Sequence, residues 1–367
     1  WWDLLNLSDK KPVVHIDVLT PKQVLFFEKI IKMLEDLDVE VLVTSRRYRE
    51  VDQLLELKKL KTYVVGSHGG KSLEKKLASS SQRILKLTKL LHKIKPNVSV
   101  SHSSPETARV SFGLGIPHLC VNDSPHSEAV ARLTVPLSKK LLTPSIIPLK
   151  AWLKFGLNKK LIVRYKALDP VVWLRGFQPN PKILSQLGIS ASETIVVVRP
   201  EETYASYLLK QTGGRFVYMK IVERLLEELD KDVVLVVLPR YKEQLDILKR
   251  TFNGRIIVPE RVIDATSLLF YSSIFVGGGG TMNTEAALLG VPTFSFYPGK
   301  PTYIEKFLSK KGLLKRVVNP KSLTRKIVKT LKNLDEVKKV CTLKARNLIL
   351  NMEDPAKVVV KTISDYL

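Results

Sequence analysis

Four consecutive glycines stand between an apolar segment and a segment with the composition of a helix start. Glycine has no Cβ atom, so a ligand can approach this backbone closely, and the amides and positive dipole end of the following helix favour an anion. The pattern predicts a strand, a bare turn and a helix that together bind a nucleotide diphosphate. The alternative is a tight turn that close packing alone requires. The residues concerned are Gly277, Gly278, Gly279, Gly280, Thr281 and Glu285.

The spacing around the glycines differs from that of two well-known phosphate loops. No Lys-Ser or Lys-Thr pair follows them, as it does in a P-loop, and no acidic residue completes a dinucleotide-binding fingerprint. After another predicted strand, Arg199 is a candidate phosphate clamp and Glu201 a candidate group that faces the ligand. A surface ion pair explains Arg199 and Glu201 equally well.

Polar side chains also gather after three predicted strands in the first half of the chain. In a parallel sheet such strand ends share one rim, where ligands bind. His126 beside Asp123 is the best acid/base candidate, because a nearby carboxylate orients an imidazole and raises its proton affinity. The alternative is that Asp123 caps a helix and that His126 is exposed in its first turn. The rim candidates are Asp17, Thr20, Ser103, Ser104, Asp123, His126 and Glu128.

The histidines and the glycine turn lie in different halves of the chain. All six histidines belong to the first half, so we expect that half to supply the general base and the acceptor surface, while the second half binds the nucleotide. His15 and His118 lie within apolar strands and are predicted to be core residues. Neither His-x₃-His nor Cys-x₂-Cys spacing occurs, so we predict no metal and no required cofactor.

Hydrophobic patterning places these residues at the ends of alternating strands and helices. The first series has strands at 12–19, 40–44, 61–65, 97–101 and 118–121, with helices at 23–37, 72–93 and 105–114. The second has strands at 194–198, 233–238, 256–258, 274–276 and 293–296, with helices at 216–229, 242–252, 265–271 and 283–289 and two basic helices after them. Such alternation predicts parallel sheets covered by helices on both faces.

Residues 161–181 interrupt this pattern. They contain three prolines and no clear periodicity, which indicates an interdomain crossing rather than an element. We therefore predict an N-terminal acceptor and catalytic domain at 1–165, a hinge at 166–182 and a C-terminal nucleotide-binding domain at 183–367. The predicted fold class is α/β, with two Rossmann-like parallel-sheet domains that face a cleft.

The chain is strongly basic, with 60 Lys and Arg against 35 Asp and Glu and a net charge of +25. The excess lies in residues 51–200 and 301–367, whereas residues 201–300 are balanced. An anionic partner is therefore predicted, either a phospholipid surface, a lipid-linked phosphate or a nucleic acid. The alternative is a solvated, lysine-rich surface. The two cysteines favour neither a disulfide framework nor a zinc site, as is typical of a cytoplasmic protein.

Two segments are candidate contacts with a membrane, although no apolar stretch reaches the length of a spanning helix. The predicted helix at 72–93 has an apolar stripe that includes Leu73 and Leu77, predicted to be core, and a basic flank that includes Arg83. Ile147, Trp152 and Phe155 stand near lysines and are candidates for docking at the lipid interface. The predicted location is the cytoplasm, with peripheral attachment to the inner face of the membrane.

Several motifs resemble a mostly archaeal family of uncharacterised proteins with the GT-B glycosyltransferase architecture. Its relatives look like the UDP-N-acetylglucosamine 2-epimerases and the glycosyltransferase that makes lipid II in bacteria. The resemblance spans nearly the whole chain. The motifs are Asp17–Pro21, Val43–Tyr48, His68-Gly69-Gly70, Ser103-Ser104-Pro105, Asn122–His126, Val198-Arg199-Pro200 and Gly277–Pro292.

The resemblance implies that the glycine turn binds a diphosphate and that Glu285 holds the ribose hydroxyls. The family's strand-end motif His-Gly-Asp-Thr, with its catalytic Asp, appears here as His102-Ser103-Ser104-Pro105, so a carboxylate is missing. Asp123 and Glu128 lie near where other epimerase carboxylates would fall. Arg199-Pro200-Glu201 stands where the epimerases carry a His-Arg-Arg-Glu segment.

The leading hypothesis is a metal-independent GT-B glycosyltransferase that uses a nucleotide-diphosphate sugar, with a UDP-sugar favoured. The glycine-turn amides, the helix dipole and Arg199 would stabilise the leaving diphosphate, while His126 or Asp123 would deprotonate a lipid-linked acceptor. The first alternative is a UDP-N-acetylglucosamine 2-epimerase-like enzyme. The second is a GT-B scaffold that binds RNA or a ribonucleoprotein through basic helices at 72–95 and 306–346.

Overall fold

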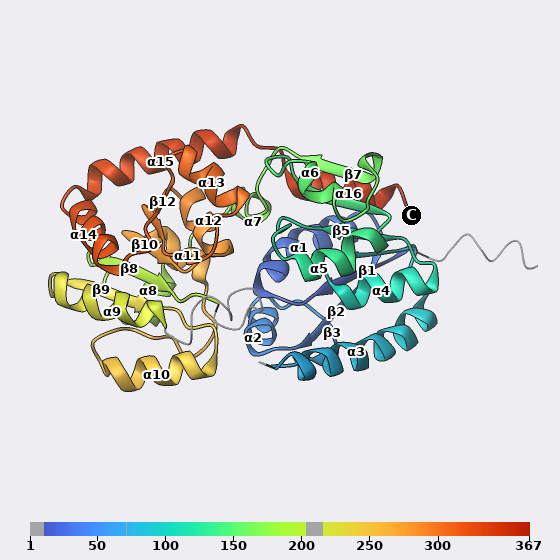
Figure 1. Cartoon of the computed structure of the whole chain (residues 1–367), viewed down its shortest axis with the longest axis horizontal. Helices are drawn as coiled ribbons and strands as arrows, with labels where there is room; N and C mark the ends of the chain where they lie inside the picture. Colours follow the sequence, from blue (N-terminus) through green and yellow to red (C-terminus); the bar gives the residue numbers. More distant parts are fainter. Residues whose placement is uncertain (1–10, 71, 203–215) are drawn as a thin grey trace, which may run out of the picture. The chain divides into compact units, whose positions relative to one another are not determined.

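The computed structural model describes residues 11–70, 72–202 and 216–367 and divides into two compact units (Figure 1). The first unit contains the chain up to Trp173 together with Glu353–Leu367, and the second contains Leu174–Met352. Each unit is built on one parallel β-sheet. The predicted fold class, two α/β domains with parallel sheets, is therefore confirmed.

The sheet of the first unit has seven parallel strands in the order β3-β2-β1-β4-β5-β6-β7. The interior strand β1 reads VVHIDV and is buried along its whole length, as expected for a strand covered on both faces. The strands are β1 Val13–Val18, β2 Glu40–Arg47, β3 Tyr63–Ser67, β4 Val98–Ser101, β5 His118–Val121, β6 Lys140–Pro144 and β7 Ile162–Tyr165.

Helices cover this sheet in two groups. The strand order reverses direction between β1 and β4, and right-handed crossovers then place the helices before and after that point on opposite faces. Accordingly α1 packs against α2 and α16, while α4 packs against α3 and α5. The helices are α1 Pro21–Glu35, α2 Arg49–Leu57, α3 Leu73–Ile94, α4 Pro105–Leu114, α5 Glu128–Thr134, α6 Lys150–Leu153, α7 Val171–Leu174 and α16 Pro355–Ser364.

The second unit has five parallel strands in the order β12-β11-β10-β8-β9. Its apolar core lies in two layers, one beneath α9, α10 and α14 and the other beneath α8, α11 and α12. The strands are β8 Thr194–Arg199, β9 Val233–Val237, β10 Ile274–Gly277, β11 Thr293–Ser295 and β12 Leu314–Arg316. The helices are α8 Lys182–Gln186, α9 Val217–Glu228, α10 Lys242–Phe252, α11 Ala265–Tyr271, α12 Thr281–Leu288, α13 Tyr303–Lys310, α14 Pro320–Leu331 and α15 Leu334–Leu350.

The predicted crossing at 161–181 is wrong in part, because it contains the edge strand β7 and the short helix α7. The strand β7 lies at the edge of the sheet and is only partly buried, so it lacks the fully apolar run by which the equally short β5 was predicted. The predicted strand at 256–258 makes only a single bridge, between Ile257 and Val236.

The end of the chain returns to the first unit rather than completing the second. Figure 1 shows α16, in red, among the blue and green elements that precede Trp173. Asp354 caps α16 by accepting from the amide of Ala356 at 3.0 Å, and Lys29 of α1 binds the same carboxylate at 2.8 Å. The predicted second domain, 183–367, thus extends past the compact unit, which ends at Met352.

The burial of side chains differs from the prediction in both segments that were candidate membrane contacts. Leu73 and Leu77, predicted to be core, are 68% and 70% exposed, because the first turns of α3 extend past the core. Arg83, predicted to be on the flank, is buried. Trp152 and Phe155 lie in an apolar core and are therefore not available for docking. Within the described part of the chain, no helix has both the length and the apolar character that crossing a membrane requires.

Candidate functional site

The glycine turn begins at the carboxyl end of β10, the middle strand of the second unit's sheet. Gly277 is level with Arg199 at the end of β8 and with Ser295 at the end of β11. The amide of Gly278 donates to the carbonyl of Arg199 at 2.9 Å. A Cβ atom on Gly278 would lie 2.5 Å from the Cα atom of Glu201, so no larger residue fits there. Close packing therefore explains why this residue is glycine, which agrees with the alternative interpretation of the run as a tight turn.

Gly280 has a different reason to be glycine. It is the N-cap of α12 with φ 94° and ψ −168°, a conformation that residues with a side chain rarely adopt. Six helices, α3, α4, α11, α13, α14 and α16, begin with a polar side chain that accepts a backbone amide. The helix α12 is among those without a side-chain cap, its N-cap is a glycine, and its first turn holds no acidic residue. Uncapped amides at a helix start are suited to an anionic ligand.

The other predicted groups of the second unit are held by protein contacts. Glu285 on α12 is 3% exposed, and its Oε1 accepts from Thr266 Oγ1 at 2.5 Å. Glu201 is buried, its Oε1 accepts from the amide of Val217 at 2.8 Å, and burial raises the pKa of its carboxyl group. Arg199 Nη1 donates to the carbonyls of Leu238 and Pro239 at 3.1 and 2.8 Å. Their roles toward a nucleotide stay predictions.

Sequence reasoning missed Arg240, which contacts the glycine turn. Its Nη2 donates to the carbonyl of Gly279 at 3.2 Å. Arg240 follows a correctly predicted strand, and the carboxyl ends of parallel strands share one rim. The available signal was therefore a basic residue immediately beyond the end of β9.

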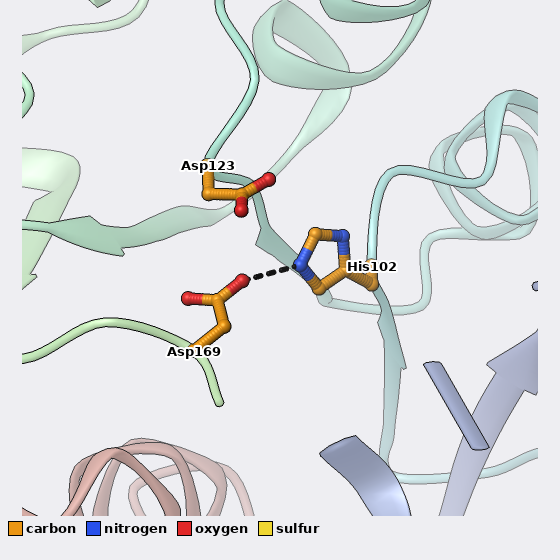
Figure 2. A group of neighbouring side chains, drawn as sticks. All are labelled: His102, Asp123 and Asp169. Atoms are coloured by element: carbon orange, nitrogen blue, oxygen red, sulfur yellow. Dashed lines mark hydrogen bonds and ion pairs between the residues drawn. The ribbon is translucent and has the colours of Figure 1, made fainter. Parts of the chain in front are cut away.

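In the first unit, four polar side chains form a cluster at the carboxyl ends of the strands, which we call the lysine cluster: Lys22, His102, Asp123 and Asp169. Lys22 Nζ lies 2.6 Å from Asp123 Oδ2 and 2.7 Å from Asp169 Oδ2. His102 Nε2 lies 2.9 Å from the same Asp169 oxygen. Tyr165 donates to the other oxygen of Asp169 at 2.6 Å. Figure 2 shows the His102 ring and the two carboxyl groups around a common space.

The charges of the lysine cluster stabilise one another. Burial alone would lower the pKa of Lys22, but Asp123 and Asp169 raise it above its usual value. Burial alone would raise the pKa of Asp169, but Lys22 and His102 bring it below its usual value. Lys22 is therefore an ammonium group and Asp169 a carboxylate at neutral pH.

The same cluster contains a geometric candidate for a metal site. His102, Asp123 and Asp169 offer ligand atoms that lie within 4.8 Å of one another. Lys22 already supplies a cation bonded to both carboxylates. The prediction that no metal is required stays a prediction. Lys22, His102 and Asp169 were not among the predicted site residues, and for Asp169 the reason is that it lay in the segment interpreted as a hinge.

His126 and Asp123 differ from the predicted dyad. The Asp123 carboxylate binds Lys22 and accepts from Ser124 Oγ at 2.8 Å. Burial lowers the pKa of His126 and outweighs the opposite effect of Asp123, so the predicted rise in proton affinity is wrong. An imidazole with a lowered pKa is neutral at pH 7, as a general base must be.

The remaining rim candidates have identifiable local contacts. Glu128, the first residue of α5, is exposed and accepts from Arg132 Nη2 at 2.6 Å, which lowers the pKa of its carboxyl group. Ser104 is buried and caps α4 by accepting from the amide of Thr107 at 3.2 Å. Ser103 has φ 64° and donates to the carbonyl of Val121 at 3.0 Å. Thr20 is half-buried at the N-cap of α1.

Asp17 lies in the interior rather than at an accessible rim. Its carboxylate binds Arg83 Nη1 and Nη2 at 3.1 and 2.6 Å and accepts from Thr44 and Thr107, each at 2.7 Å. Burial alone would raise the pKa of Asp17, but Arg83 brings it well below its usual value. These contacts belong to a buried ion pair.

His15 and His118 are core residues, as predicted. His15 contacts Ser99 Oγ at 3.2 Å and Thr44 Oγ1 at 2.8 Å. His118 contacts Ser101 Oγ at 2.9 Å and Ser138 Oγ at 3.0 Å. Burial lowers the pKa of His15 to about 4 and that of His118 to about 3, so both are neutral at pH 7.

The chain consists of two α/β units, each built on one parallel sheet, and this is the GT-B architecture. A structure of the UDP-N-acetylglucosamine 2-epimerase of Methanocaldococcus jannaschii with UDP-N-acetylglucosamine and UDP has a TM-score of 0.70 and 17% identity, covering 96% of this chain and 99% of its own. The MnaA–UDP structure from S. aureus has a TM-score of 0.73 and 15% identity, covering 97% and 96%. The spinosyn rhamnosyltransferase SpnG with spinosyn aglycone has a TM-score of 0.62 and 13% identity, covering 96% and 100%.

The chain belongs to the family described as Protein of unknown function (DUF354), whose model matches residues 13–367. A protein of Methanocaldococcus jannaschii described as uncharacterised is 32% identical over 359 residues, which cover 96% of this chain and 98% of that protein. Membership of this family confirms the resemblance drawn from the sequence motifs.

Proposed function

We propose that this protein is a GT-B glycosyltransferase that uses a nucleotide-diphosphate sugar, with UDP as the nucleotide. The observation that carries the proposal is the start of α12, where Gly280 leaves the helix without a side-chain cap at the end of the central strand β10. Helix amides and the helix dipole favour the diphosphate in the ground state and more strongly as it leaves. Two structures of similar fold hold UDP according to their descriptions, which supports this choice of nucleotide.

Glu285 is proposed to bind the ribose hydroxyls. It lies on α12, one turn after the glycine turn, and Thr266 of α11 holds one of its carboxylate oxygens. A carboxylate accepts hydrogen bonds at both oxygens, so this arrangement orients the group for a diol.

His126 is proposed to be the general base in the first unit. Part of its side chain reaches solvent, while the protein atoms around the ring disfavour the imidazolium, so the lowered pKa keeps the imidazole neutral and able to accept a proton from an acceptor hydroxyl. The Asp123 carboxylate is bound to Lys22, which favours His126 over Asp123 for that step. As a member of the lysine cluster, Asp123 is suited to orient the acceptor.

The acceptor is proposed to be lipid-linked and to be reached at an anionic membrane surface. Leu73 and Leu77 of α3 are exposed and stand one turn apart, beside Lys75 and Lys76. Exposed apolar side chains among lysines are typical of contact with anionic lipid. The protein should sediment together with phosphatidylglycerol vesicles. The double variant Leu73→Ser, Leu77→Ser should remain in the supernatant. Leu350→Ser, at an equally exposed leucine on α15, is the control.

Calorimetric titration with UDP tests the nucleotide site. We expect micromolar binding that Glu285→Ala abolishes, because the ribose loses its acceptor, while the exposed control Glu223→Gln binds as the native protein does. If UDP does not bind, but RNA binds with a steep dependence on salt, the glycosyltransferase proposal fails and the RNA-binding alternative replaces it.

A UDP-N-acetylglucosamine 2-epimerase-like activity is the second candidate. The observation that favours it is the lysine cluster, because epimerisation needs groups that remove and return a proton, and His102 and Asp169 are bonded to one another there. Ser104, which stands in place of the family's catalytic Asp, counts against it. Incubating the protein with UDP-N-acetylglucosamine in D₂O separates the candidates. Deuterium at C2 of the sugar would establish epimerisation, whereas its absence together with transfer to an added acceptor supports the glycosyltransferase.

A further inference from the structure

We propose that Arg240 is the side chain that recognises the diphosphate at the glycine turn, and that Arg199 acts as a positioning residue for it. This inference rests on the proposed function, because it names the group that reads the phosphates at the proposed nucleotide site. It assigns the charged contact to a different arginine from the one that the sequence pattern indicated.

The guanidinium group of Arg240 spans the ends of two neighbouring strands. Its Nε donates to the carbonyl of Pro200, just after β8, at 3.0 Å, and its Nη2 donates to the carbonyl of Gly279, just after β10, at 3.2 Å. A Cβ atom on Gly280 would lie 3.6 Å from the same Nη2. The positive charge is therefore beside the uncapped start of α12, where the anion is proposed to bind.

The backbone of Arg240 is fixed by contacts on both sides. Arg199 Nη1 donates to the carbonyls of Leu238 and Pro239, the two residues immediately before Arg240. After it, the amide of Arg240 donates to Oε1 of Gln244, a buried residue of α10, at 2.8 Å. A group held in place before the ligand arrives loses little entropy on binding, so it contributes more to affinity.

The chemistry of a guanidinium group suits both contacts at once. It presents five N–H donors in a planar fork, so one side can hold backbone carbonyls while another edge binds phosphate oxygens. The side chain of Arg240 is only 17% exposed, with Glu202 at 3.9 Å from Nη1, so solvent screens its charge weakly. A lysine would keep the charge but could not bridge the two carbonyls in the same way.

Calorimetric titration of UDP, UMP and inorganic pyrophosphate into Arg240→Gln and Arg240→Lys tests the assignment. We expect Arg240→Gln to weaken the binding of UDP and of pyrophosphate by about 10- to 100-fold, the range for a lost hydrogen bond to a charged group. The binding of UMP should weaken less. Arg240→Lys should retain part of the affinity, because it keeps the charge. Arg250→Gln, at an exposed arginine on α10, should bind all three ligands as the native protein does.

The pattern of losses distinguishes recognition from a merely structural role. If Arg240 only held the turn, Arg240→Gln and Arg240→Lys would weaken UDP binding equally, and that result would overturn the assignment. Unchanged UDP binding in both variants would also overturn it. Arg199→Gln should add nothing to the loss in Arg240→Gln if it acts through Arg240, whereas additive losses would show that Arg199 itself contacts phosphate. If the native protein binds pyrophosphate through Arg240 but not UDP, the proposed function fails and the anion site stands.

Discussion

At the scale of single residues, solvent access separates two carboxylates that look alike in the sequence. Asp17 is the fifth residue of β1, and Asp123 follows β5 in the same parallel sheet. Asp17 is enclosed by Arg83 and two threonines, whereas Asp123 lies beside Lys22 near the surface. A buried ion pair contributes to specifying the fold, and only a group that a ligand reaches contributes to binding.

Removing the charge of Asp17 should destabilise the first unit strongly. Asp17→Asn removes the hydrogen-bonded counter-ion of the buried Arg83 and leaves it only the Glu106 carboxylate at 4.0 Å, which costs about 3 kcal/mol in the free energy of unfolding. Urea denaturation at pH 7 measures the loss, with Asp38→Asn as the control at an exposed carboxylate that pairs with Lys11. Equal stability of the two variants would contradict the buried pair.

The stability difference between the native protein and Asp17→Asn should depend on pH, and the pKa of Asp17 fixes the direction. The pKa of Asp17 is lower in the folded protein than in the unfolded chain, where it is about 3.9. Its contribution is therefore complete above that value and declines as the pH falls below it. The stability difference between the native protein and Asp17→Asn should narrow below about pH 4.

His15 should make the first unit sensitive to mild acid. Its pKa falls from the usual 6.5 to about 4 in the folded state, because burial disfavours the imidazolium. The unfolded chain therefore binds the proton first, and stability declines as the pH falls from 6.5 to about 4, by about 3 kcal/mol. Unfolding of His15→Gln, followed in urea at several pH values, should show a decline that is smaller by this amount, because His118 still contributes its own share, whereas the exposed His92→Gln should keep the full decline.

At the scale of elements, the glycine turn combines two requirements in one run of residues. Gly278 is needed because the backbone after β8 passes too close for a side chain. Gly280 is needed because the helix must start with positive φ and with no capping group. The packing explanation and the anion-binding explanation therefore apply to different glycines rather than competing for the same one.

Two glycine-to-alanine substitutions should have opposite effects. Gly278→Ala places a Cβ atom 2.5 Å from the backbone of Glu201 and should destabilise the second unit by about 2 kcal/mol, with loss of UDP binding. Gly113→Ala in α4 meets only the end of the Arg109 side chain and should stabilise the first unit slightly, since alanine is the better helix former. Thermal unfolding of both variants provides the measurement, and a neutral Gly278→Ala would refute the close approach.

At the scale of the whole molecule, the two units are not two successive halves of the chain. The last helix, α16, packs against α1, so the first unit is complete only when the C-terminal residues have joined it. Val359 of α16 is fully buried in that contact region of the first unit. The stability of the N-terminal unit therefore depends on the end of the chain.

Truncating a buried side chain on α16 should destabilise the first unit selectively. Val359→Ala removes two methyl groups from the core and should cost about 2 kcal/mol, while Lys361→Ala on the exposed side of the same helix should cost little. Calorimetric unfolding should show a lower transition for one unit only. A shift of the second unit's transition instead would contradict the assignment of α16.

The sequence predicted the long, buried elements well, because a run such as β1 or the glycine turn carries its signal in neighbouring residues. It missed β7, a partly exposed edge strand without a continuous apolar run, and therefore missed Asp169 as a member of the lysine cluster. It also placed Leu73 and Leu77 in the core, since periodicity shows which side chains share a helix face but not how far the core extends beneath it.

The sequence by itself determined the two parallel-sheet series, the glycine turn at a strand end and the two core histidines, because local spacing and hydrophobicity encode all of these. Only the tertiary structure decided which charged groups meet. Lys22, His102, Asp123 and Asp169 come from segments up to 147 positions apart, as the pair Lys22–Asp169 shows. The tertiary structure also brings Arg240, rather than Arg199, to the carbonyl of Gly279. Contacts between strand ends depend on strand order and crossover, which no local pattern specifies.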